Sequence, residues 1–82
     1  MHSTSPTAVI KLRADAFAEW AEGEGLATEG AQAERIGVDR SILSRIRRGE
    51  TVPGERFIAA TLAASGLEFE RLFEVAEIAE AS

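Results

Sequence analysis

The segment that most constrains the fold of this chain runs over residues 32–53, with the sequence QAERIGVDRSILSRIRRGETVP. Within it, residues 40–48 hold four arginines, although the whole chain carries a formal net charge of −5. On a helix turning about 100° per residue, the aliphatic residues share one side and the arginines and serines share the other. Such a helix rests on a core through one face and presents polar groups on the other. The apolar face holds Ile42, Leu43 and Ile46, and the polar face holds Arg40, Ser41, Ser44, Arg45, Arg47 and Arg48.

Both ends of this helix can be predicted from local signals. Asp39 is a suitable N-cap, because its carboxylate can accept an orphan backbone N–H at the positive end of the helix dipole. Gly49 stands where a left-handed C-cap is least costly, and Pro53 keeps the helix from restarting. We therefore expect a helix of about nine residues with defined ends.

A second short helix is predicted immediately upstream. Thr28 can cap it, Ile36 ends its apolar edge, and Gly37 stops it. Only Gly37 and Val38 separate it from the cap at Asp39, so the two helices must meet at a steep angle. Two short helices, a glycine turn and a basic outer face are the features of a helix-turn-helix.

These residues resemble the Cro/C1-type family of helix-turn-helix DNA-binding proteins, and the resemblance runs from about Leu12 to Phe73. Its most specific part is AERIGVDRSILSRIRRG, where apolar–Gly–Val forms the turn and Ser-Arg-Ile precedes the closing Arg-Gly. The resemblance implies an all-α fold, a compact five-helix lambda-repressor-like domain with its motif at about residues 28–49. It also implies that double-stranded DNA is the partner, bound in the major groove.

The resemblance further implies which side chains contact the DNA. Arg40, Ser41 and Arg45 match the base-facing positions, where an arginine fork fits the O6 and N7 acceptors of guanine. Ser44 and Arg48 match positions nearer the sugar-phosphate backbone. The predicted DNA-binding set comprises Arg40, Ser41, Ser44, Arg45, Arg47, Arg48 and Glu29.

The chain departs from the family pattern at four positions. Glu29 stands where the family often has glutamine, Gln32 where an apolar residue packs, and Arg47 where glutamate is frequent. Gly30 is an unusual choice inside a helix, where it costs about 0.5–1 kcal/mol relative to alanine. The changes at Glu29 and Gln32 motivate an alternative function, an antitoxin-like or adaptor module that binds another protein.

Outside the motif, the sequence predicts helices joined by short connections within one domain. Residues 1–7 are expected to form a polar arm that contains a single histidine, His2, without a specific role. Trp20 is expected to pack at the core rather than to stack on a base. The domain is expected to span residues 8–80, with further helices over Ala8–Glu22, Glu55–Ala64 and Glu68–Glu80.

The last of these helices is more apolar than one small core requires. Val75 and Ile78 widen its apolar stripe, which has two interpretations: a broad core helix, or a self-complementary dimer contact. We favour a homodimer through this C-terminal helix. A two-fold dimer would place two recognition helices about 34 Å apart on a pseudo-palindromic site.

Composition narrows the remaining classes of function. Without cysteine, the chain has neither a disulfide framework nor a thiolate zinc site. No stretch approaches the roughly 18 apolar residues that span a bilayer, and the N-terminus lacks the regions of a signal peptide, so a cytoplasmic location is expected. No residue set indicates catalysis, and we expect no metal and no cofactor.

The charge of the chain is divided between its parts. Lys and Arg outnumber Asp and Glu by three in residues 35–56. Asp and Glu outnumber Lys and Arg by four in residues 1–34 and again by four in residues 57–82. The bias toward arginine and alanine is typical of GC-rich bacterial or phage genomes. The sequence therefore predicts a small, homodimeric, sequence-specific DNA-binding transcriptional regulator. It could be a Cro-like or a controller-type protein, and a repressor or an activator.

Overall fold

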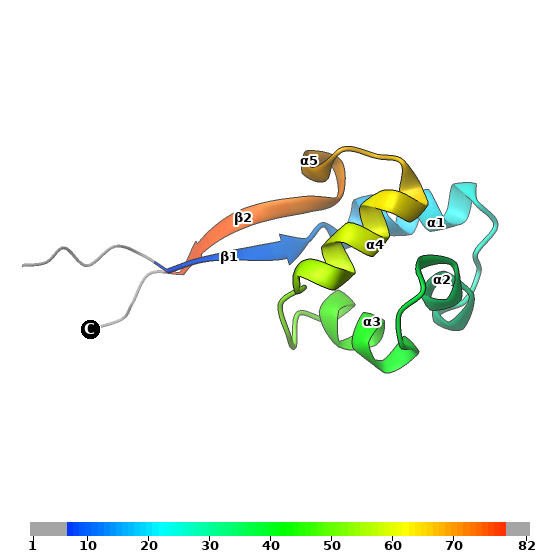
Figure 1. The fold of residues 1–82 in the computed structure, drawn as a ribbon, viewed down its shortest axis with the longest axis horizontal. Helices are drawn as coiled ribbons and strands as arrows, with labels where there is room; N and C mark the ends of the chain where they lie inside the picture. The colour runs from blue at the N-terminus through cyan, green and yellow to red at the C-terminus, as the bar shows by residue number, and fades with distance from the viewer. Residues whose placement is uncertain (1–6, 79–82) are drawn as a thin grey trace, which may run out of the picture.

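The computed structural model describes residues 7–78, as helices and two strands (Figure 1). The predicted arm at residues 1–6, including His2, lies outside the described part. Thr7, the last residue of the predicted arm, begins a strand instead. In chain order the elements are β1 (Thr7–Leu12), α1 (Ala14–Gly23), α2 (Glu29–Ile36), α3 (Arg40–Arg47), α4 (Glu55–Ser65), α5 (Phe69–Leu72) and β2 (Phe73–Ile78).

The prediction of a helix over Ala8–Glu22 is wrong in its first half. Residues 7–12 form β1, Arg13 has extended backbone angles, and α1 starts only at Ala14. Three of the six residues of β1 are β-branched, which favours a strand because these side chains lose little freedom on a pleated surface. The helical spacing that suggested one long helix holds only for its second half.

The prediction of a helix over Glu68–Glu80 is also wrong. Helix α5 covers only Phe69–Leu72, and the chain then continues as β2. The dimer contact expected on a C-terminal helix therefore has no helix to carry it. The all-α fold class is wrong for the same reason, because the described residues combine helices with a two-stranded antiparallel sheet.

The two strands form a ribbon, defined here as β1 paired with β2, that projects from the helical body (Figure 1). Its register pairs Leu12 with Phe73 at the base, Ile10 with Val75 in the middle and Val9 with Ala76 further out. Directly opposed residues point to the same face of an antiparallel pair, so Ile10 and Val75 share a face. The ribbon joins the two ends of the described chain.

Arg13 fastens the base of the ribbon to the helices. Its backbone N–H donates to the carbonyl of Leu72 at 2.8 Å, and its Nε donates to the carbonyls of Glu70 at 3.0 Å and Phe73 at 3.2 Å. These bonds satisfy two carbonyl groups of α5 that have no partner within that short helix, and the carbonyl of the first residue of β2. The change from α5 to β2 is thereby held in place.

One apolar core joins the ribbon to the helices. Phe73 contacts Phe57 of α4 edge to face, with ring centroids 6.3 Å apart, and stacks on Phe69 at 5.3 Å. Trp20 is partly buried, 5.5 Å from the ring of Phe17, which confirms the prediction that it packs at the core. The buried core residues are Phe17, Ala33, Ile36, Leu43, Ile46, Phe57, Leu72 and Phe73.

Candidate nucleic-acid interface

Helices α2 and α3 follow one another in the chain across a short turn. The hydroxyl of Thr28 accepts a hydrogen bond from the backbone N–H of Ala31 at 3.1 Å, which confirms the predicted N-cap of α2. Gly37 ends α2 in the left-handed region at φ 90°, where a Cβ would be strained. Only residues 37–39 separate the two helices, so α3 leaves the turn steeply from α2 (Figure 1).

Helix α3 is anchored through one side and exposed on the other. Leu43 is completely buried and Ile46 is 5% exposed, so both sit in the core as predicted. Its polar residues at positions 40, 41, 44, 45 and 48 lie on the opposite side, because residues three or four positions apart share one face of a helix. The predicted contact residues Arg40, Ser41, Arg45 and Arg48 are exposed, and Ser44 is partly buried.

Asp39 occupies the predicted N-cap position but does not cap the helix with its side chain. No backbone N–H donates to its carboxylate. The hydroxyl of Ser41 donates to Asp39 Oδ2 instead. The capping prediction is therefore wrong in its mechanism, because a hydroxyl two residues away competes for the same oxygen. The contact holds the Ser41 side chain at the start of the exposed face.

Arg47 differs from the other arginines of α3 because it is turned toward the protein. Its Nη1 donates to Glu29 Oε2 and to Gln32 Oε1, each at 3.3 Å. Its guanidinium carbon lies 5.8 Å from the centroid of the Phe17 ring, within the range of a cation–π contact. Its side chain is 26% exposed. Arg47 thus links α3 to α2 and α1.

Three departures from the family pattern belong to this one cluster. Gln32 is 7% exposed, and its Nε2 donates to the carbonyl of Leu26 at 3.0 Å while its Oε1 accepts from Arg47. Glu29 supplies the carboxylate that balances the arginine charge. The resemblance does not predict that these three residues contact one another. The signal in the sequence is that two polar substitutions on one helix and a charge reversal on the next indicate compensating partners.

Two arginines of α3 form no ion pair with the acidic residues of the described part of the chain. Among the described residues, the ion pairs join Arg13 to Glu74, Arg35 to Glu24, Arg47 to Glu29 and Arg48 to Glu50. Neither Arg40 nor Arg45 takes part in one. The Arg48 pair is open to solvent, with both side chains more than half exposed, so it holds Arg48 only weakly.

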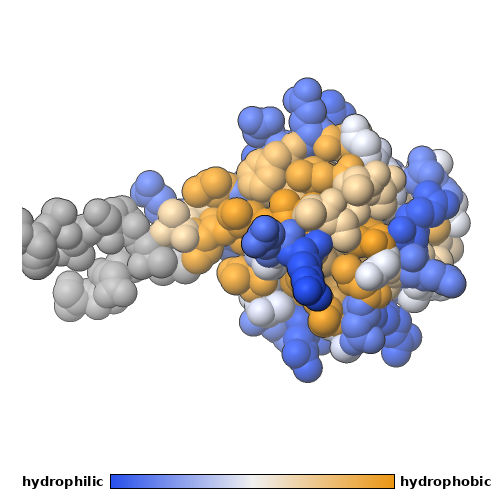
Figure 2. Space-filling model, viewed as in Figure 1, coloured by the Kyte–Doolittle hydropathy of each residue, from blue (hydrophilic) through white to orange (hydrophobic). Residues whose placement is uncertain are grey.

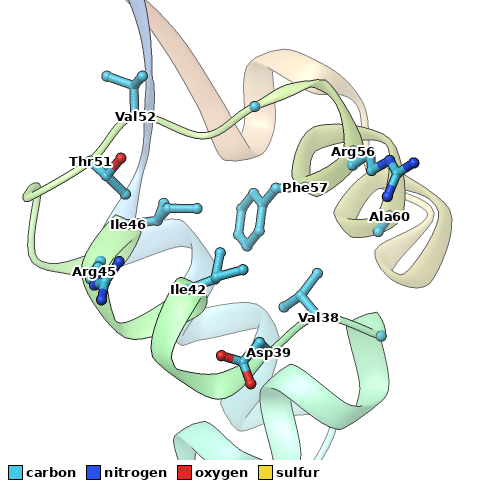
Figure 3. Close-up of a pocket in the computed structure, with 12 residues that line it drawn as sticks. Val38, Asp39, Ile42, Arg45, Ile46, Thr51, Val52, Arg56, Phe57 and Ala60 are labelled. Atoms are coloured by element: carbon cyan, nitrogen blue, oxygen red, sulfur yellow. The ribbon is translucent and has the colours of Figure 1, made fainter.

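A groove of about 650 Å³ opens beside the exposed face of α3. Figure 3 shows Val38 from the turn, Ile42 from α3 and Phe57 from α4 pointing toward one another. Ile42 was expected on the buried face, but it is 44% exposed and lines the groove. Charged side chains also line it: Asp39, Arg45 and Arg56.

Two further features, a metal cluster and a membrane-spanning helix, are absent from residues 7–78. These residues contain no cluster of three or more His, Cys, Asp or Glu side chains that could hold a metal ion. None of the helices there is long and apolar enough to cross a membrane.

Comparison with known proteins returned no match to this chain among protein-family models, curated proteins or solved structures. The resemblance to the Cro/C1-type family therefore rests on the motif residues themselves.

Proposed function

We propose that this protein is a sequence-specific, DNA-binding transcriptional regulator of the cytoplasm, without enzymatic activity. The observation that carries the proposal is the exposed face of α3, where Arg40 and Arg45 have no ion-pair partner among the described residues. Two unpaired cations on a helix anchored by Leu43 and Ile46 suit a polyanion. In a chain of net charge −5, this placement favours one orientation of the bound duplex.

In this proposal, α3 enters the major groove of DNA. Arg40, Ser41 and Arg45 contact base edges, and guanine is the base that an arginine fork fits best. Ser44 and Arg48 contact the sugar-phosphate backbone, and the solvent-exposed pair of Arg48 with Glu50 is weak enough to open.

Glu29 and Arg47 have a different role in this proposal. Their contact with each other favours a positioning role over direct contact with DNA. They hold α3 at its angle to α2, and the phenylalanine ring under Arg47 supports the same geometry.

The regulator would bind a pseudo-palindromic operator as a homodimer, with two α3 helices about 34 Å apart. Self-association would use the ribbon, since residues 73–78 form a strand and not the predicted helix. Val75 is 64% exposed and shares a face with Ile10, and each strand leaves one edge without a pairing partner in the described chain. Exposed apolar side chains and open edges are the features through which strands associate.

The test is selection of bound sequences from random DNA, followed by gel shifts of the selected site at several salt concentrations. The logarithm of the binding constant should fall with the logarithm of salt at a slope near −4 to −5 for the dimer, if each subunit neutralises about two or three phosphates. The double variant Arg40→Ala with Arg45→Ala should lose at least roughly thirtyfold in affinity for the selected site. Arg71→Ala, which removes an exposed arginine from α5, is the matched control. A slope near zero, or sequence-specific binding retained by the double variant, would contradict the proposal.

The alternative, an antitoxin-like or adaptor module, was motivated by Glu29 and Gln32. Both residues contact Arg47, so their presence needs no external protein. The observation that still favours a protein partner is the groove beside α3.

A further inference from the structure

We propose that the groove between α3 and α4 binds an acidic, apolar segment of a second protein. The groove is defined by Val38, Ile42, Ile46, Val52, Phe57 and Ala60, with Arg45, Arg56 and Asp39 around them (Figure 3). Because Arg45 also belongs to the proposed DNA face, the segment and DNA should exclude one another. This exclusion, and the choice of a different protein over a second copy of this chain, rest on the proposed function, whereas docking in the groove does not.

The first argument is the exposure of large apolar side chains. Only Ile42, Val52 and Val75 are exposed large hydrophobic residues among those described, and two of the three line this groove. Ile42 is 44% exposed and Val52 is 53% exposed, so both lose contact with water if the groove is covered. Apolar side chains are also visible over a wide part of this face of the molecule (Figure 2).

The second argument is the size of the groove. A volume of about 650 Å³ lies within the roughly 300–1,000 Å³ of pockets that hold a small molecule, a size comparable to a few buried side chains of a partner. It has room for the apolar anchors of a short amphipathic segment, which are spaced at three or four positions along a helix.

The third argument is charge. Arg45 and Arg56 line the groove, and neither has an ion-pair partner among the described residues. Asp39, the carboxylate on the same groove, already accepts the hydroxyl of Ser41. A neutral hydroxyl leaves that carboxylate charged, so two arginines against one aspartate give the groove a net positive charge, which fits carboxylates flanking the apolar anchors of a partner.

A second copy of this chain fits the groove less well than a different protein does. A two-fold contact here would cover Arg45 in both subunits and remove it from the DNA face. The third exposed hydrophobic residue, Val75, lies on the ribbon and gives self-association a separate surface. The groove then remains open in a DNA-binding dimer.

The experiment uses two synthetic 16-residue helical peptides with the same leucine positions, flanked by glutamate in one and by lysine in the other. Fluorescence anisotropy measures their binding to the full-length protein. The glutamate peptide should bind, and Ile42→Thr and Val52→Glu should each weaken it by about tenfold, since both remove apolar anchor area. Thermal unfolding of each variant shows whether it is folded.

A competition experiment tests the exclusion of DNA by the peptide. With the glutamate peptide at ten times its Kd, the apparent Kd for the selected DNA site should rise roughly tenfold.

Several results would overturn the proposal. These are no binding of the glutamate peptide, equal binding of the lysine peptide, or binding that both folded variants retain. Conversion of a dimer to a monomer by Val52→Glu would show that a second copy occupies the groove instead. Simultaneous binding of peptide and DNA would contradict the exclusion. If the peptide binds through Ile42 and Val52 while the wild type binds no DNA, the docking site is supported and the proposed function fails.

Discussion

The helix pair α2–α3 and the ribbon are stabilised in different ways. The ends of the helices in the pair are set by contacts between neighbours in sequence, with a cap at Thr28 and a left-handed turn at Gly37. The ribbon depends on distant partners, as in the bond from Arg13 to Phe73, 60 positions further along the chain. The helix pair presents unpaired arginines, whereas the ribbon presents apolar side chains and glutamates. The proposed function assigns a separate role to each surface, binding of a polyanion to the helix pair and self-association to the ribbon.

The largest effect is expected where the ribbon enters the core. Phe73 is completely buried, and Phe73→Ala should lower the free energy of unfolding by about 3–5 kcal/mol through lost contacts and the cavity left behind. Chemical denaturation measures this change. Val75→Ala, on the same strand but exposed, is the control and should change stability by no more than about 0.5 kcal/mol. Equal effects of the two variants would show that the ribbon does not share the core of the helices.

A second prediction separates the two kinds of arginine on α3. Arg45→Ala should weaken binding to the selected DNA site by about 1–3 kcal/mol while leaving stability nearly unchanged. Arg47→Met, which keeps the apolar stem, should lower stability by about 1 kcal/mol because it leaves Glu29 and Gln32 without their partner. Gel shifts and thermal unfolding are measured on both variants. The reverse pattern would mean that Arg47, and not Arg45, reads the DNA.

A third prediction concerns the ribbon as the dimer surface. Val75→Glu should weaken dimerisation by about 1–2 kcal/mol, since it places a charge on an apolar contact face. Sedimentation at several concentrations measures this shift, with Ala63→Glu on the exposed side of α4 as a matched charge control. A wild type that stays monomeric at high micromolar concentration would remove the dimer from the proposed function.

The smallest effect is expected inside α2. A Cβ added at Gly30 would lie 3.8 Å from Arg40 Cδ and 3.9 Å from Thr28 Oγ1, which is ordinary van der Waals contact. Gly30→Ala should therefore raise stability by about 0.5–1 kcal/mol, through the lower conformational entropy of the unfolded chain. For a domain of this size the melting temperature should rise by roughly 2–8 °C. A lower melting temperature would indicate that the glycine relieves a clash with Arg40.

The sequence alone determined the helix pair and the anchoring of its second helix. Thr28, Gly37 and Gly49 act within a few residues of their own backbone, and the amphipathic pattern around Leu43 repeats within two helical turns. Such signals need no information about distant parts of the chain, so the ends of α2 and α3 could be predicted. Helix α4 was predicted to within one residue for the same reason.

Only the tertiary structure decided the conformation of residues 7–12 and 73–78, the two strands of the ribbon. Residues 73–78 contain alanine and glutamate, which suit a helix. They form a strand because β1 offers them backbone hydrogen-bond partners and because Phe73 packs in the core. Likewise, the spacing of the arginines on α3 could not show that Arg47 turns inward to Glu29, or that Ile42 borders a groove. Both results depend on which residues from other elements lie beside that helix, and a local pattern carries no information about them.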